Sequence, residues 1–70
     1  MPKLTIKQWR LIRGKTQEEV ANACGVAIPT IREWENNPEK ITLAKLFKLF
    51  ALYNITFEDI IFLPNDTTNM

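Results

Sequence analysis

One stretch of sequence decides the fold of this chain, QEEVANACGVAIPTIREWEN, which runs from Gln17 to Asn36. Gly25 lies in its middle and suits the left-handed position that ends a helix and lets the chain turn sharply. Ala21, one turn earlier, is small enough for a following helix to cross closely. Pro29 is tolerated in the first turn of that following helix. The stretch therefore predicts two short helices that cross at a sharp turn.

Apolar side chains are spaced to hold this crossing together: Val20, Cys24, Val26, Ile31 and Trp34. Such a layout is a helix-turn-helix unit. At about 100° per residue, the second helix directs Ile31 and Trp34 to the core, with Thr30 at the margin. Its outward face then holds Ile28, Pro29, Arg32, Glu33 and Asn36. Two apolar residues in the first turn of an outward face suit a surface that meets a partner, such as thymine methyl groups.

Helix signals continue along the whole chain. Capping threonines predict where four helices begin: Thr5, Thr16, Thr42 and Thr56. Predicted ends lie at Gly14, Gly25, Asn54 and before Pro64. Within the longest helix, Leu43, Leu46, Leu49, Phe50 and Tyr53 follow helical spacing and are expected to face the core. Helices this short are marginal alone, so they must share one core. We predict an all-α domain of five helices over residues 1–63, with a flexible tail over residues 64–70.

Composition excludes several classes of function. The chain has 70 residues, one Cys and no His, with a net charge of +1. Zinc sites of the usual Cys/His kind and His-based acid–base catalysis are therefore excluded, so we expect no metal, no cofactor and no enzymatic activity. A lone Cys suggests a reducing compartment. Without an apolar run long enough to cross a membrane, or a signal-peptide pattern, the protein is expected in the cytoplasm.

Basic residues gather in the first part of the chain. Five lie within residues 1–15, where there is no acidic residue: Lys3, Lys7, Arg10, Arg13 and Lys15. A basic edge on a nearly neutral chain fits a surface that binds anions. An ordinary solvated helix face would look the same.

The motifs together resemble one family. They are Ile6-x-x-Trp9-Arg10, Thr16-Gln17-Glu18-Glu19-Val20-Ala21, Gly25-Val26, Thr30-Ile31-x-x-Trp34-Glu35 and Leu43-x-x-Leu46-x-x-Leu49. This pattern resembles the helix-turn-helix of the lambda repressor and Cro family, also called the XRE or Cro/CI family, over about residues 5–62. The resemblance implies a five-helix domain with the helix-turn-helix at its second and third helices, the latter being the recognition helix over about residues 28–36.

The resemblance also implies roles for individual residues. The base-facing positions are Ala27, Ile28, Pro29, Arg32 and Glu33. Positions that meet phosphates are Thr16, Gln17, Thr30, Asn36, Lys40 and Thr42, and Gln17 also braces the recognition helix. Arg10 and Glu35 match a structural ion pair. Ala27 replaces the usual Ser or Thr, which removes a side-chain cap worth about 1 kcal/mol. Ile28 and Pro29 cannot make the bidentate amide contact to adenine.

The predicted function is a sequence-specific regulator that binds double-stranded DNA, a Cro-like repressor of phage, prophage or bacterial origin. We expect a homodimer on inverted half-sites, weak in solution and joined through Phe57, Ile61 and Phe62, since exposed apolar patches usually mark contacts. A chain of 70 residues is expected to leave no room for a domain that senses a small-molecule ligand. The alternative is an antitoxin or antirepressor module whose main partner is a protein.

Overall fold

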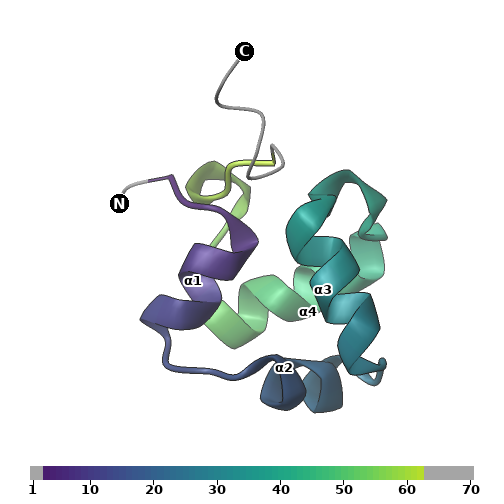
Figure 1. The fold of residues 1–70 in the computed structure, drawn as a ribbon. Helices are drawn as coiled ribbons and strands as arrows, with labels where there is room; N and C mark the ends of the chain where they lie inside the picture. The colour runs from purple at the N-terminus through teal and green to yellow at the C-terminus, as the bar shows by residue number, and fades with distance from the viewer. Residues whose placement is uncertain (1–2, 63–70) are drawn as a thin grey trace.

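A computed structural model describes residues 3–62 of the chain. Within that range it has four α-helices and two 3₁₀ turns (Figure 1). In chain order these are α1 (Ile6–Ile12), α2 (Gln17–Cys24), α3 (Ile28–Asn36), η1 (Pro38–Lys40), α4 (Leu43–Tyr53) and η2 (Phe57–Asp59). The predicted tail over residues 64–70 lies outside the described residues. None of the described helices is long and apolar enough to cross a membrane.

The predicted helix boundaries are confirmed for α1 to α4. Thr5, Thr16 and Thr42 are the N-caps of α1, α2 and α4, and each side chain accepts a hydrogen bond from the backbone N–H three residues later. Gly25 ends α2 with φ +71°, and Asn54 ends α4 with φ +58°. Local chemistry therefore sets where these helices begin and end.

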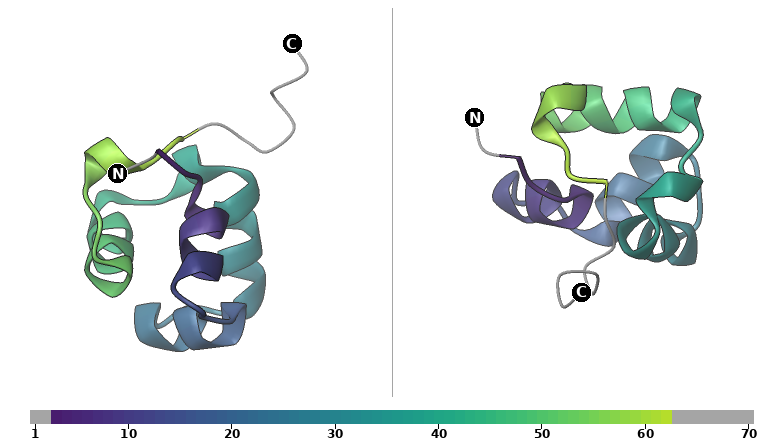
Figure 2. Two further views of the ribbon diagram at one scale, coloured as in Figure 1. Left: turned by 90° about the vertical axis from the view of Figure 1, so that its left-hand side faces the viewer. Right: turned by 90° about the horizontal axis from the view of Figure 1, so that it is seen from above.

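The prediction of a fifth α-helix is wrong. Thr56 and Asp59 do form the expected capping box, but it closes only the single turn η2. The backbone then becomes extended at Ile60, which pairs with Leu4 in a parallel bridge. Leu4 N–H donates to the Asp59 carbonyl at 3.1 Å, and Ile61 N–H donates to the Leu4 carbonyl at 2.9 Å. Figure 2 shows these two segments side by side, and their pairing prevents the helix from continuing.

One core joins the elements. It consists of Ile6, Trp9, Val20, Ala21, Cys24, Ile31, Trp34, Ile41, Leu46, Leu49, Phe50, Tyr53, Ile55 and Ile60. The expectation that Leu43 faces this core is wrong, because its side chain is 58% exposed. It is the first residue of α4 and lies about one helical turn before Phe47, which is also exposed.

Polar side chains tie the helices together at their ends. Trp9 Nε1 donates to the Asp59 carbonyl at 2.7 Å, and Arg13 Nε donates to the Tyr53 carbonyl at 2.7 Å. The Arg13 guanidinium also lies 5.0 Å from the centre of the Trp9 ring. Lys45 Nζ donates to the Cys24 carbonyl at 3.0 Å. Because a cation at the last carbonyls of a helix is favourable, these contacts stabilise α2 and α4 where they meet their neighbours.

Candidate nucleic-acid interface

Helix α3 presents one face to the core and one to solvent. Ile31, Trp34 and Glu35 are buried. The exposed residues of the helix and its N-cap are Ala27, Pro29, Arg32, Glu33 and Asn36. Ile28 was also predicted to point outward, but its side chain is half-buried and packs against the core. Its position in the first turn puts it at the border between the two faces.

A buried ion pair fixes α3 against α1. Arg10 Nε lies 2.6 Å from Glu35 Oε2, and the side chains are only 9% and 4% exposed. A second guanidinium nitrogen of Arg10 donates to Glu35 Oε1 at 3.4 Å, and the third donates to the Lys15 carbonyl at 3.0 Å. Every nitrogen of the guanidinium therefore has a partner. A buried pair with this geometry holds α3 in one orientation relative to α1.

Gln17, at the start of α2, extends this pair to the surface. Its Nε2 donates to Glu35 Oε1 at 3.1 Å. Its Oε1 accepts from Nε of Arg32 at 3.3 Å. Arg10, Glu35, Gln17 and Arg32 thus form one chain of hydrogen bonds, which we call the Arg10–Arg32 network. Sequence reasoning predicted the Arg10–Glu35 pair and the bracing by Gln17, but no local signal connected Gln17 to Arg32.

Glu33 and Lys40 form a second, exposed ion pair. Lys40 Nζ lies 2.9 Å from Glu33 Oε2, and Asn37 Nδ2 donates to the same oxygen at 3.3 Å. The hydrogen bond from Lys40 lowers the pKa of Glu33, and its counterpart raises the pKa of Lys40. Glu33 is therefore an ionised acceptor at neutral pH. The turn η1, which sequence reasoning missed, carries Lys40 back to α3.

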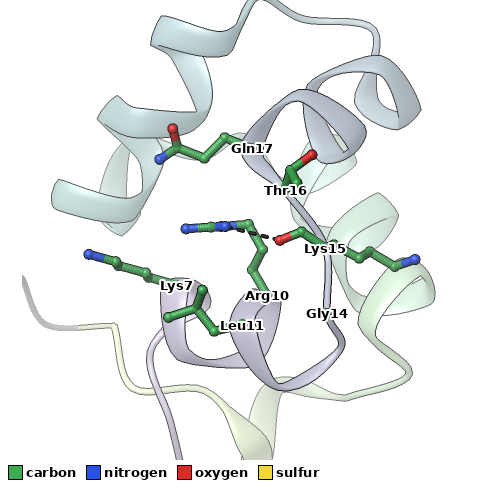
Figure 3. A pocket seen from close by; sticks show the side chains of 7 residues that line it. All are labelled: Lys7, Arg10, Leu11, Gly14, Lys15, Thr16 and Gln17. Atoms are coloured by element: carbon green, nitrogen blue, oxygen red, sulfur yellow. Dashed lines mark hydrogen bonds between the residues drawn. The ribbon is translucent and has the colours of Figure 1, made fainter.

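A shallow groove of about 480 Å³ runs between α1 and the start of α2 (Figure 3). It is lined by Lys7, Arg10, Leu11, Gly14, Lys15, Thr16 and Gln17. The first backbone N–H groups of α2 and the side chains of Lys7 and Lys15 give this groove a positive field, whereas the charge of Arg10 is balanced by Glu35. Such a surface can take an anionic group, although Glu18 and Glu19 in the first turn of α2 reduce the field.

Comparison with known proteins agrees with this arrangement. The model of the helix-turn-helix family of the XRE, Cro and CI type matches residues 6–60. The chain belongs to this family. The family is one of DNA-binding transcription regulators. No curated protein and no solved structure matches the chain.

As a helix-turn-helix protein, the chain places its expected phosphate-binding residues in three locations. Thr16 and Gln17 lie at the start of α2, beside the basic groove. Asn36 is the last residue of α3, and Lys40 and Thr42 follow it, in η1 and at the N-cap of α4. A third location holds Thr30, which is half-buried in the first turn of α3.

Aromatic residues form a separate surface on this helix-turn-helix domain. Phe47, Phe57 and Phe62 are 52%, 48% and 36% exposed, and we call them the aromatic patch. The rings of Phe47 and Phe57 contact buried Phe50, and each other, edge-to-face, with the Phe50 and Phe57 centroids 4.8 Å apart. The ring centroids of Phe57 and Phe62 lie 6.4 Å apart, and Ile61, which precedes Phe62, is half-buried. Sequence reasoning identified Phe57, Ile61 and Phe62 as contact residues, but it did not connect them with Phe47.

Two observations concern metal ligands and the single cysteine in the described residues. Over residues 3–62 there is no group of three or more His, Cys, Asp or Glu side chains that could hold a metal ion. The thiol of Cys24 is buried in the core, and this burial raises its pKa. A buried, protonated thiol acts as a small apolar side chain rather than a nucleophile.

Proposed function

We propose that this helix-turn-helix protein is a sequence-specific repressor of the Cro type, which places the exposed face of α3 in the major groove of double-stranded DNA. The observation that carries the proposal is that the Arg10–Glu35 pair holds the buried face of α3 against α1, while the other face of this helix is exposed. A helix fits the major groove, and its exposed side chains can then reach base edges. The residues proposed to face bases are Ala27, Ile28, Pro29, Arg32 and Glu33.

Phosphate contacts would orient the domain on the duplex. We assign them to Thr16, Thr30, Asn36, Lys40 and Thr42, together with the basic groove beside α2. The amide of Gln17 already donates one hydrogen to Glu35, so only its second hydrogen is left for a phosphate. Contacts of this kind set position and affinity without reading sequence.

Two copies are needed for useful specificity, because the nine residues of α3 span few base pairs. The aromatic patch, with Ile61, is the surface proposed to join them. A two-fold pair would then bind inverted half-sites about 10 base pairs apart, on one face of the DNA. A repressor of this type would act in the cytoplasm of a bacterial host, on a bacterial or phage operator.

The test is selection of bound sequences from a pool of random double-stranded oligonucleotides. The expected result is an inverted repeat, bound far more tightly than random duplex, with an affinity that falls steeply as salt rises. A protein that enriches no sequence and shows no salt-dependent affinity for DNA would overturn the proposal. That outcome would instead favour the alternative of a module whose main partner is a protein.

A further inference from the structure

The Arg10–Arg32 network connects the buried core of the domain to one exposed base-facing side chain. Its inner end is the buried Arg10–Glu35 pair, at 2.6 Å. Its outer end is exposed Arg32, whose Nε donates to Gln17 Oε1. Among residues 3–62, half-buried Gln17 provides the hydrogen bonds that link the two ends. The position of Arg32 therefore depends on the orientation of the Gln17 amide.

The chemistry of Glu35 fixes that orientation. An ionised carboxylate only accepts hydrogen bonds, so the NH₂ group of Gln17 must face it. The amide oxygen of Gln17 is then directed to the other side, where it can attract only a donor. A phosphate oxygen, which is an acceptor, is repelled from that side, whereas the N–H of Arg32 is attracted. This arrangement suits the positioning of Arg32 better than the binding of a phosphate by Gln17.

Arg32 keeps its two terminal nitrogens available. Within the part of the chain that the structure describes, only its Nε has a hydrogen-bond partner. A guanidinium held at Nε presents its two terminal NH₂ groups end-on, as a fork. The matching pair of acceptors in the major groove is O6 and N7 of guanine, which is the most frequent specific partner of arginine.

We propose that Gln17 is a positioning residue which holds Arg32 for bidentate reading of one guanine in each half-site. This inference rests on the proposed function, because it requires α3 to lie in the major groove. It assigns to Gln17 an effect on sequence preference rather than the phosphate contact expected from its position at the start of α2. It also assigns a G·C pair to the part of the half-site that faces Arg32.

The two roles of Gln17 predict different binding data. A positioning residue changes the ratio between binding to the correct and the wrong base pair, while a phosphate contact changes binding to all sequences by one factor. Gln17→Met keeps the length of the side chain but removes both hydrogen bonds. Arg32→Lys keeps the positive charge but removes the fork. Together the two variants separate the reading of a base from simple attraction to phosphate.

The experiment uses the duplex that the wild-type protein selects from the random pool. At each guanine of the half-site, one duplex carries 7-deazaguanine, which lacks the N7 acceptor, and another carries an A·T pair. Wild type is expected to lose about tenfold in affinity at one guanine. In Gln17→Met and in Arg32→Lys, the loss at that guanine should fall to about twofold, while affinity for random duplex changes little. The double variant should lose no further discrimination, because both changes remove the same contact.

Controls separate this inference from the proposed function. Asn22→Ala removes an exposed amide elsewhere on α2 and should keep the wild-type discrimination. Circular dichroism and thermal unfolding check that Gln17→Met remains folded. If Gln17→Met weakens consensus and random duplexes by the same factor, or if no guanine loses affinity on N7 removal, the positioning role is wrong while the DNA-binding function stands. If wild type selects no sequence at all, the proposed function fails instead.

Discussion

Glu35 Oε2 of α3 and Arg10 Nε of α1 lie 2.6 Å apart in the interior of the domain, although the two residues are 25 apart in sequence. Gln17 donates a further hydrogen bond to the same carboxylate. Two charges in an apolar interior are tolerated only when they are paired and hydrogen-bonded, so each depends on the other. The orientation of α3, and with it the face proposed to read DNA, is therefore linked to the stability of the fold.

Removal of one member of this pair should strongly destabilise the protein. Arg10→Met leaves the Glu35 carboxylate buried without its cation, which costs about 3–5 kcal/mol. Small domains are stable by only about 5–15 kcal/mol, and a chain of 70 residues lies near the lower end. We expect a large loss of helical signal or a much lower urea midpoint. Measurement is by circular dichroism during urea titration.

The matched control for that prediction is the double variant Arg10→Met/Glu35→Leu. It removes both charges and should recover much of the lost stability, because no buried charge is left unpaired. A single variant that loses less than about 1 kcal/mol would show that the pair is not buried in solution as it is in the structure.

A substitution at Tyr53 should maintain or increase stability rather than reduce it. Its side chain is fully buried, and its hydroxyl has no hydrogen-bond partner among residues 3–62. Burial, with a further contribution from the Glu35 carboxylate, raises the pKa of Tyr53, so the hydroxyl is neutral. Tyr53→Phe removes an unpaired polar group and should hold or raise the free energy of unfolding, by up to about 1–3 kcal/mol. A clear loss of stability in thermal or urea unfolding would mean that the hydroxyl is bonded.

Sequence reasoning predicted the parts of the fold that depend on neighbours in the chain. The caps at Thr5, Thr16, Thr42 and Asn54 were all predicted, since each acts within one helical turn. The prediction of a fifth helix was wrong because Thr56 and Asp59 give a valid start signal within one turn. The backbone pairing that follows this turn involves Leu4, which is far away in sequence. Local patterns cannot show a contact between the two ends of a domain.

The same limit applies to the candidate site. Spacing on α3 predicted which residues are exposed, apart from half-buried Ile28. It could not predict that Gln17 meets Arg32, or that Lys40 meets Glu33, because both contacts depend on how separate elements pack. Resemblance to the family suggested the pair of Arg10 and Glu35, but its distance and burial come only from the structure.

Glu33 should affect binding to specific and random DNA in opposite directions. Glu33→Ala removes an ionised acceptor proposed to face a base, which should cost about 1–3 kcal/mol on the selected duplex. It also removes the negative charge beside Lys40, so this lysine should bind its phosphate more strongly. Affinity for random duplex should therefore rise slightly, with a steeper salt slope. Titrations of both duplexes at several salt concentrations measure the two effects.

Lys40→Ala is the matched control for Glu33. It should weaken binding to both duplexes by a similar factor and make the salt dependence shallower. If Glu33→Ala lowers affinity for both duplexes equally, then Glu33 does not read sequence and its role is to hold Lys40.

The aromatic patch should determine cooperative binding. Phe57 and Phe62 are 48% and 36% exposed, and a charge at either position would be desolvated when two copies meet. Phe57→Asp and Phe62→Asp should therefore abolish cooperative binding to a duplex with two half-sites, about 10 base pairs apart centre to centre. Weak binding to a single half-site should remain, because the patch is separate from α3. Helical content should also remain, since neither side chain is part of the buried core.

Titration of duplexes with one and two half-sites, together with sedimentation of the protein–DNA complexes, measures this effect. Ile12→Asp is the matched control, since Ile12 is 56% exposed but lies on α1 rather than in the patch. The Ile12→Asp variant should bind a duplex with two half-sites as cooperatively as the wild-type protein does. Because the patch is small, the free protein should sediment as a monomer or weak dimer and pair fully only on DNA. If Phe57→Asp and Phe62→Asp both occupy two half-sites as cooperatively as wild type, the two copies meet through a different surface.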